Sequence, residues 1–189
     1  EALKKELDVD VEIVVLDLLE EKNLYKLYEK YSDKKIDIFI NNAGFGLFGD
    51  FVQTDLDREL EMIKLNVVAY HVLTKLFLKK FVKEDRGYIL NVCSSAGFLA
   101  GPKLATYYAT KNYVLKLTMA IYEELRHEKS SVVISALCPG PVSTEFNKVA
   151  HGGFSVKEAD SRYVAKYAVD KMFQKKLIIV PTLSMKLGL

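Results

Sequence analysis

Three side chains in the segment 94–111 carry functional groups suited to acid–base chemistry: the Ser94 hydroxyl, the Tyr107 phenol and the Lys111 ammonium. Tyr107 and Lys111 are four residues apart, and this spacing places both side chains on one face of a helix. Ser94 follows an apolar, strand-like run, and a short glycine-containing loop separates it from Tyr107. The segment therefore predicts a hydroxyl, a phenol and an ammonium at one centre.

A catalytic phenol needs a pKa closer to the working pH than its free value near 10. Lowering that pKa by about three units requires roughly 4 kcal/mol of preferential stabilisation of the phenolate. A nearby ammonium supplies much of this in a desolvated site, so we expect Lys111 to lower the pKa of Tyr107. The chemistry that follows is proton transfer in a carbonyl–alcohol oxidoreductase. Taken alone, the spacing also fits a tyrosine on a helix face beside a solvated lysine.

Other polar groups also follow apolar runs or interrupt helical patterns. Asn66 lies within a predicted helix, where asparagine is mildly unfavourable. It is either a solvated residue or a polar group that links Lys111 through water to solvent. The segment 41–44 closes a strand-like run, and its Gly44 lets a ligand approach the backbone. The segment 138–144 is rigid and could present backbone groups and the Thr144 hydroxyl to a flat amide. Plain turns are the alternative for both segments.

Apolar runs alternate with helical patterns along the whole chain. Strands are predicted at 11–17, 36–44, 87–95, 132–140 and 176–181, and helices at 20–31, 55–83, 105–128 and 157–173. A short helical remnant is predicted at 2–7, and a loop or lid at 143–156. Because the runs are apolar on both faces, they indicate buried parallel strands. We therefore expect an α/β fold, with one parallel sheet covered on both faces and joined by right-handed crossovers.

The polar clusters all come at the carboxyl ends of these predicted strands. They are Asp17, Asn41–Asn42, Ser94–Ser95 and Cys138–Pro139–Gly140. In open α/β sheets, ligands bind outside the carboxyl ends of the strands. The sequence therefore predicts a single crevice at that edge of the sheet.

Composition excludes several other classes of protein. The chain has 189 residues and a formal net charge of +2, which gives no reason to expect nucleic acid binding. It has no apolar stretch of the roughly 18 residues that a membrane span needs, and no secretory signal, so we predict a cytoplasmic protein without membrane contact. Cys93 and Cys138 are predicted to be buried, reduced thiols. No spacing of cysteine and histidine indicates a metal site.

Together these motifs resemble the short-chain dehydrogenase/reductase family in its shorter, single-domain form. The matching residues occur in the family's order over nearly the whole chain. They are Asp17 after its strand, Asn-Asn-Ala-Gly at 41–44, Asn66, Ser94 with Gly97, Tyr107 with Lys111, and Pro139–Gly140 with Thr144. Each motif is weak by itself, but together and in register they form a specific signal.

The resemblance implies a doubly wound, Rossmann-like sheet in three α/β/α layers and a nicotinamide cofactor, NADP or NAD, with NADP favoured. It implies a catalytic tetrad in which Tyr107 is the general acid or base, Lys111 lowers its pKa and contacts the ribose, Ser94 positions the substrate oxygen and Asn66 supports the proton relay. The implied cofactor contacts are Asp17, Leu18, Asn42, Ala43, Gly44, Tyr107, Lys111, Pro139, Gly140, Val142 and Thr144.

The resemblance also implies partners and a lid. The substrate is a small carbonyl compound or alcohol, and the loop 145–156 covers it. The helices at 55–83 and 105–128 are similar to those that form the family's dimer interface, so a homodimer or homotetramer is expected.

The beginning of the chain departs from the family pattern. The family opens with a strand, a glycine-rich turn and a helix that bind the cofactor pyrophosphate. Glu1 falls in the helix after the second strand of that pattern. We therefore interpret 1–189 as a single, partial dinucleotide-binding domain, truncated at its N-terminus. An uncovered sheet edge, an open apolar face and weak cofactor binding follow. Cys138 also stands where the family often has asparagine.

Two other functions remain compatible with the motifs. A relative that binds cofactor or a partner without turnover would act as a sensor or scaffold, although it would have no need of Ser94, Tyr107 and Lys111 together. A sugar-nucleotide epimerase or dehydratase shares the tyrosine–lysine chemistry, but the chain after Tyr107 is too short for a separate sugar-nucleotide domain.

Overall fold

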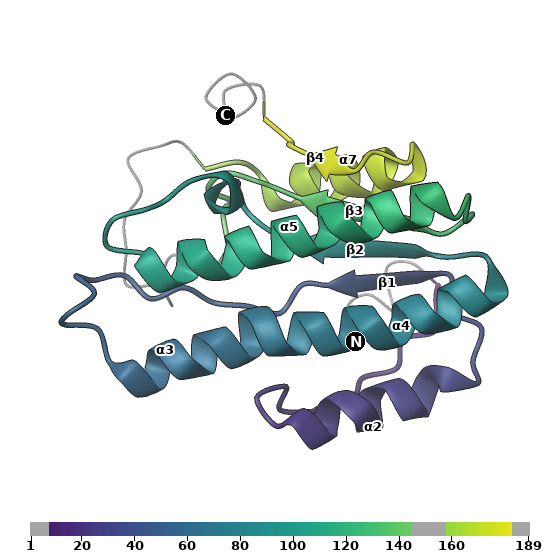
Figure 1. Ribbon diagram of the computed structural model, residues 1–189, viewed down its shortest axis with the longest axis horizontal. Coiled ribbons are helices and arrows are strands. Elements are labelled where there is room, and N and C mark those ends of the chain that lie inside the picture. The colour runs from purple at the N-terminus through teal and green to yellow at the C-terminus, as the bar shows by residue number, and fades with distance from the viewer. Residues whose placement is uncertain (1–7, 145–157, 183–189) are drawn as a thin grey trace.

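The computed structural model describes residues 8–144 and 158–182, which form a four-stranded parallel sheet with helices on both faces (Figure 1). The strands are β1 (Ile38–Asn41), β2 (Tyr88–Val92), β3 (Val133–Leu137) and β4 (Ile178–Ile179). They lie in the order β1-β2-β3-β4, and every neighbouring pair is parallel. The predicted α/β fold is confirmed, and each of these strands lies within its predicted run.

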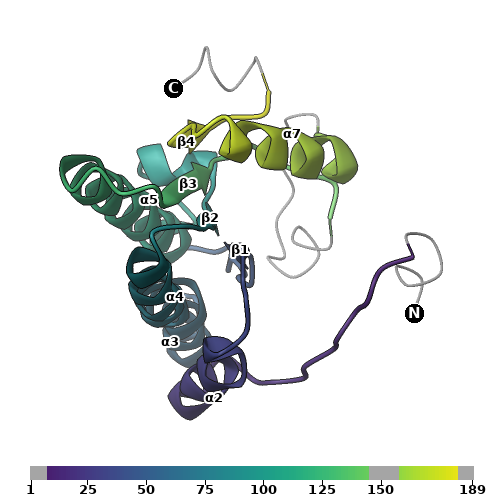
Figure 2. The same cartoon turned by 90° about the vertical axis from the view of Figure 1, so that its right-hand side faces the viewer.

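The helices form two layers, one on each side of the sheet. They are α2 (Glu21–Ser32), α3 (Leu56–Ile63), η1 (Lys64–Ala69), α4 (Tyr70–Glu84), η2 (Ser95–Phe98), α5 (Ala105–His127) and α7 (Ser161–Phe173). Figure 2 shows α4 and α5 on one face, with α2 beside α4, and α7 on the other face. No helix in the described ranges is long and apolar enough to cross a membrane.

Consecutive strand residues supply the two halves of the core. Ile89 and Ile134 pack into the cluster formed with α4 and α5, whereas Leu90 and Leu137 pack with Val164 and other residues of α7. Side chains of a strand alternate between its faces, so both faces of β2 and β3 are buried. This explains why their sequences are continuous apolar runs, and it confirms the expected three layers.

The handedness of the connections differs from the prediction. The strands follow one another in a single direction across the sheet, and α3–α4 and α5 connect them on the same face. The connection from β3 to β4 runs through α7 on the opposite face. It therefore has the opposite hand to the first two, so the prediction that all crossovers are right-handed is wrong for at least one of them.

The predicted strand at 11–17 is absent from the sheet. The segment is extended but unpaired, and Figure 2 shows it running away from β1. Ile13 is 73% exposed and Val15 is 90% exposed. An apolar run becomes a strand only beside a backbone with free hydrogen-bonding groups, and no described strand lies next to it. The predicted helix at 2–7 and lid at 145–156 lie outside the described residues.

The expected open apolar face is present at β1. Ile38 is 38% exposed and Ile40 is 45% exposed, although both belong to a strand of the parallel sheet. The opposite side of β1 is covered, because the Phe39 ring stacks on the Phe77 ring of α4 with their centroids 4.0 Å apart. In the described part of the chain, β1 is therefore an edge strand with one covered face.

The predicted helix at 55–83 is continuous in space but not uniform. It begins at α3, whose first turn is capped by the Asp55 carboxylate accepting from the Arg58 backbone N–H at 2.8 Å. A six-residue π-helix, η1, then separates α3 from α4. Short π-helical segments occur often at functional sites. This one contains Asn66.

We predict that Gly87→Ala destabilises the turn between α4 and β2. Gly87 has a φ of +127°, and an added Cβ would lie 2.6 Å from the Phe81 ring. Phe81 is fully buried and cannot move aside without opening the core. Backbone strain of this kind costs about 1–3 kcal/mol, and overpacking adds to it. Urea unfolding of the variant should therefore show a lower free energy of unfolding than the parent.

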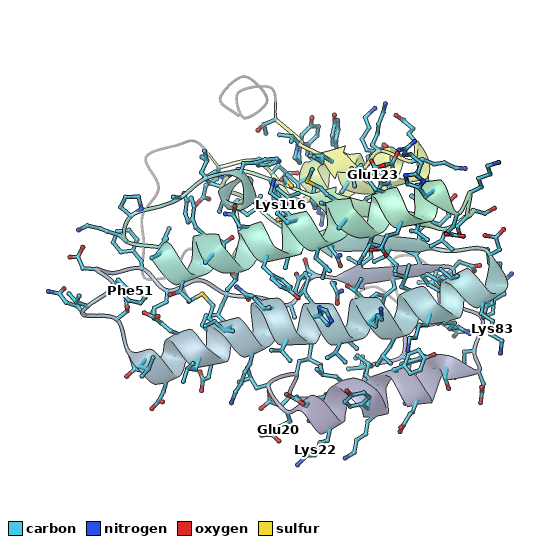
Figure 3. The ribbon with its side chains drawn as sticks, in the orientation of Figure 1. Glu20, Lys22, Phe51, Lys83, Lys116 and Glu123 are labelled. Carbon is cyan, nitrogen blue, oxygen red and sulfur yellow. The ribbon has the colours of Figure 1, made fainter. Side chains whose placement is uncertain are left out.

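Lys83→Ala is the control for this variant, because Lys83 lies on the surface at the C-terminal end of α4 (Figure 3). Its free energy of unfolding should stay within about 0.5 kcal/mol of the parent. Equal unfolding midpoints for Gly87→Ala and the parent would contradict the predicted steric conflict.

Candidate active site

A cleft of about 540 Å³ lies at the carboxyl ends of β1, β2 and β3. This is the edge at which the sequence predicts a crevice. The predicted site residues that line it are Asn42, Gly44, Ser94, Tyr107, Lys111, Pro139, Gly140, Val142 and Thr144. The fold therefore brings together side chains that are as far apart in the sequence as Asn42 and Thr144.

Tyr107 lies in the first turn of α5 and is only 7% exposed. Its phenol hydrogen-bonds with the Ser94 side chain, which also accepts from the Ala96 backbone N–H at 3.1 Å. That second bond fixes the Ser94 hydroxyl at the start of η2. The cleft wall thus carries a phenol and a hydroxyl in direct contact, as the sequence predicts.

The pKa of Tyr107 is shifted in the opposite direction to the expectation. Burial raises it to about 12, and the hydrogen bond with Ser94 opposes this rise only in part. Lys111 does not reverse the shift, since its Nζ lies 5.8 Å from the centroid of the Tyr107 ring. In the protein without a bound cofactor, the phenol is therefore a protonated acid.

Lys111 is buried, and its ammonium is held by the end of β2. Its Nζ donates to the Val92 carbonyl at 3.0 Å, and the side chain is 4% exposed. Burial lowers the pKa of Lys111, because desolvation disfavours the charged form. The solvated lysine that the spacing alone allowed is therefore excluded.

Tyr70 supports Lys111 and was missed by the sequence reasoning. Its hydroxyl donates to the same Val92 carbonyl at 3.0 Å, and its ring centroid lies 5.3 Å from the Lys111 Nζ. The ring is buried, and this burial raises the pKa of its phenol. Tyr70 is four residues after Asn66, so the shared helix face was the available signal.

Asn66 is fully buried in η1, which excludes the solvated alternative. Its Nδ2 donates to the Phe45 carbonyl at 2.9 Å, and its Oδ1 accepts from the Phe45 N–H at 3.2 Å. The same Nδ2 donates to the Thr110 hydroxyl at 3.1 Å, which itself donates to the Tyr107 carbonyl at 2.7 Å. One amide therefore connects the loop after β1 to the first turn of α5.

Gly44 lies against this amide and leaves the wall of the cleft open. A Cβ at this position would be 2.9 Å from the Asn66 Oδ1 and 3.6 Å from the Lys111 Nζ. Any side chain here would fill the space above the ammonium. Gly44 therefore keeps Lys111 accessible from the cleft.

The strand ends are tied together by buried polar contacts. The Asn41 Nδ2 donates to the Asn91 Oδ1 at 2.9 Å and to the Thr74 hydroxyl at 3.0 Å. Asn41 and Asn91 are register partners on β1 and β2. Ser95 N–H donates to the Pro139 carbonyl at 2.8 Å and so joins the chain beyond β2 to the chain beyond β3. These contacts hold the floor of the cleft in one arrangement.

Three predicted cofactor contacts do not line the cleft. Ala43 is exposed beside it. Asp17 is exposed, with its carboxylate accepting from the Leu19 N–H at 2.9 Å, and Leu18 packs against the cluster that contains Leu24. The structure places Asp17 and Leu18 just before α2, apart from the catalytic candidates. No group of acidic, histidine or cysteine side chains in the described ranges could hold a metal ion.

Comparisons with known proteins match most of the chain. The sequence profile of the short chain dehydrogenase family matches residues 1–152. A solved short-chain dehydrogenase from Sphingobium yanoikuyae in complex with NADPH is 28% identical, with a TM-score of 0.89 over 96% of this chain and 72% of that one. The NADP-dependent 3-hydroxy acid dehydrogenase of Schizosaccharomyces pombe is 32% identical over 86% of this chain and 64% of its own length.

Another relative has a different description. The inactive 2-(S)-hydroxypropyl-CoM dehydrogenase 2 of Xanthobacter autotrophicus is 29% identical over 70% of this chain and 57% of its own. The chain spans about half to two thirds of the length of the curated relatives it matches.

We predict that Gly44→Ala displaces the Asn66 amide from the Phe45 backbone. An atom 2.9 Å from the Oδ1 is too close for a carbon contact. Loss of a buried hydrogen bond costs about 1–3 kcal/mol, so the free energy of unfolding should fall by that amount. Denaturant unfolding monitored by circular dichroism measures it.

A double-mutant cycle with Asn66→Ala isolates the cause. Asn66→Ala removes the atom that an added Cβ would meet, so Gly44→Ala should cost far less in that background. Equal costs in both backgrounds would show that the strain arises elsewhere.

Proposed function

The chain belongs to the short chain dehydrogenase family, and from this premise we propose that the protein is an NAD(P)-dependent oxidoreductase. It would transfer a hydride between a nicotinamide cofactor and a carbonyl or alcohol substrate. One observation carries the proposal: Tyr107 and Ser94 are hydrogen-bonded to each other on the wall of a cleft that Lys111 also lines. Two hydroxyl donors side by side suit a carbonyl oxygen on which negative charge develops.

The roles of the four candidate residues follow from their positions. Tyr107 donates its proton to the substrate oxygen in reduction and accepts it in oxidation. Ser94 positions that oxygen. Lys111 offers its ammonium to the ribose of the cofactor and supports the phenolate. Asn66 acts indirectly, because its amide fixes the Phe45 backbone and the first turn of α5.

The residues around the cleft fit a nicotinamide and its ribose. Gly44 leaves room above Lys111, and the segment 139–142 offers a wall of small side chains and backbone atoms. A nicotinamide cofactor would supply or accept the hydride. Pro139, Gly140, Val142 and Thr144 would hold its carboxamide end, with Asn42 to Gly44 opposite. Asp17 and Leu18 would contact the adenine end.

A preference for NADP over NAD stays a prediction. The Sphingobium structure holds NADPH, and the Schizosaccharomyces relative is described as NADP-dependent. A cytoplasmic location also stays a prediction.

The cleft favours an uncharged, largely apolar substrate. Among the cleft-lining residues that the structure describes, Lys111 alone carries a formal charge. Phe45, Leu104 and Tyr108 supply apolar and aromatic surface near Tyr107. We therefore propose ketones or aldehydes with an apolar body as the first compounds to test, together with 3-hydroxy acids because of the named relative.

We also propose that the protein forms a homodimer or homotetramer through α3–α4 and α5. Leu56, Leu60 and Ile63 of this helical unit are between 37% and 67% exposed, and Tyr113 of α5 is 40% exposed. Exposed apolar side chains gathered on neighbouring helices are typical of a subunit interface.

A second candidate function is cofactor binding without turnover. The similarity to a relative described as inactive supports it. The test below separates the two functions.

We predict that Tyr107→Phe abolishes turnover. The variant lacks the phenol hydroxyl but keeps the ring, so cofactor binding should persist while kcat falls by about 10²–10⁴-fold. The assay follows nicotinamide absorbance with the protein in its complete natural sequence, using NADH and NADPH with ketones, aldehydes and 3-hydroxy acids. Tyr25→Phe is the matched control, because Tyr25 makes the same chemical change on the exposed surface of α2.

The outcomes separate the functions. Turnover in the parent that persists in Tyr107→Phe would exclude the proposed acid. Cofactor binding by a parent without turnover on any compound would favour the binding function.

The raised pKa of Tyr107 predicts different pH dependences for reduction and for oxidation. With a pKa of about 12, the phenol keeps its proton between pH 6 and 9, because this range lies at least about three units below the raised value. Reduction, which needs the proton, should therefore not decline through Tyr107 in this range. Oxidation needs the phenolate and should become faster as pH rises.

Profiles of kcat/KM in both directions measure this difference. Reduction that declines around pH 7 and is restored at lower pH would contradict the assignment of Tyr107 as the acid.

A further inference from the structure

Cys93 and Cys138 form a thiol pair that the proposed reaction does not use. They are the first residues after β2 and β3, directly beyond the register partners Val92 and Leu137. The ladder continues past these partners, since the Cys93 N–H donates to the Leu137 carbonyl at 2.8 Å. The two cysteines are therefore neighbours across the sheet.

The two side chains also point to the same side of the sheet. Both belong to the cluster with Val114 and Leu115 of α5, and each thiol shifts the pKa of the other. Adjacent strands place opposing residues at a separation that a disulfide can span. Cys93 and Cys138 are the two cysteines of these 189 residues.

The surroundings favour ionisation of one thiol. Cys93 lines the cleft although it is only 3% exposed, whereas Cys138 does not line it and is fully buried. The interaction with Cys138 and the charge of Lys111 lower the pKa of Cys93, whereas the interaction with Cys93 and burial raise the pKa of Cys138. A thiolate is the nucleophile in reactions of cysteine. Cys93 is therefore the thiol that an oxidant in the cleft would meet first, with Cys138 beside it as the resolving thiol.

We propose that Cys93 and Cys138 are a redox-sensitive dithiol that hydrogen peroxide converts into a disulfide in the wall of the cleft. The Cys93 thiolate attacks one peroxide oxygen, the O–O bond breaks, and the released hydroxide takes up a proton to become water. The resulting sulfenic acid is attacked by the Cys138 sulfur, the S–S bond forms, and the S–O bond breaks to release a second water. The two thiols lose two electrons and the peroxide gains two.

The disulfide would change the candidate active site. The Cys93 thiol donates to the Lys111 carbonyl at 3.1 Å, and this bond is lost once the sulfur has no proton. A disulfide also holds its two sulfurs much closer together than a non-bonded contact does, so it draws the ends of β2 and β3 together. Ser94 directly follows Cys93, and Pro139 directly follows Cys138. We therefore expect lower turnover in the oxidised protein, and this consequence rests on the proposed function.

The bond itself is tested by mass spectrometry, without any activity measurement. The complete protein is treated with hydrogen peroxide, its free thiols are blocked, and it is digested with trypsin. The expected product is peptide 87–103 joined to peptide 130–148, in protein lighter by two hydrogen atoms. Dithiothreitol should restore a free thiol in each of these two peptides. A blocked thiol in both peptides after peroxide treatment, or a disulfide between chains, would overturn the proposal.

Two variants test the order of the steps. Cys138→Ser lacks the resolving thiol, so a sulfenic acid at Cys93 should accumulate and react with dimedone. Cys93→Ser should leave Cys138 unoxidised under the same treatment, because Cys138 does not line the cleft. Dimedone labelling of Cys138 in place of Cys93 would overturn the proposed order.

Turnover measured on the same samples tests the consequence. The link between the dithiol and the site is supported if the parent loses turnover and dithiothreitol restores it. Cys138→Ser without dimedone should show no such loss. Unchanged turnover in protein that carries the disulfide overturns that link. If the reduced parent binds cofactor but has no turnover, the proposed function fails, and the mass measurement still decides whether the disulfide forms.

Discussion

The buried ammonium of Lys111 is the constraint around which the site is built. A charge inside a protein is costly unless it is hydrogen-bonded, and the Val92 carbonyl at the end of β2 supplies that partner. The acceptor exists only because β2 ends there, and Tyr70 of α4 closes the other side by binding the same oxygen. Gly44 leaves the remaining side open to the cleft. Sheet, helix and loop must therefore all be in place before the lysine can be buried.

A second constraint fixes the helices relative to one another. Asn66 uses both its Oδ1 and its Nδ2 on the backbone of Phe45, and its Nδ2 also reaches Thr110 of α5. Asn66 lies in the π-helix η1, which departs from the regular geometry of α3 and α4 around it. The π-helix thus helps to assemble the site, as Lys111 does, because it brings the loop after β1 to the turn that carries Tyr107.

The sequence predicts features that depend on residues close together along the chain. It does not predict features that depend on residues far apart along the chain. The helix at 105–128 and its Tyr107–Lys111 face follow from local spacing, and apolar runs locate β1 to β4. The segment 11–17 has the same pattern as those strands but has no neighbour in the described sheet, so it stays unpaired. Three other features join segments that only the fold brings together. They are the π-helix around Asn66, the contact of Tyr70 with Lys111, and the pairing of Cys93 with Cys138.

The direction of the pKa shift at Tyr107 shows why a positively charged cofactor would matter to the proposed chemistry. Spacing predicted a lowered pKa from Lys111, but burial acts on the phenol and the ammonium alike, and it favours the neutral form of each. A rise from about 10 to about 12 corresponds to roughly 3 kcal/mol against the phenolate. Positive charge in the cleft would oppose that penalty, as an oxidised nicotinamide ring does. The hydroxyl pair is therefore ready to donate to an oxygen, whereas removal of a proton from an alcohol would require more positive charge near the phenol than Lys111 supplies.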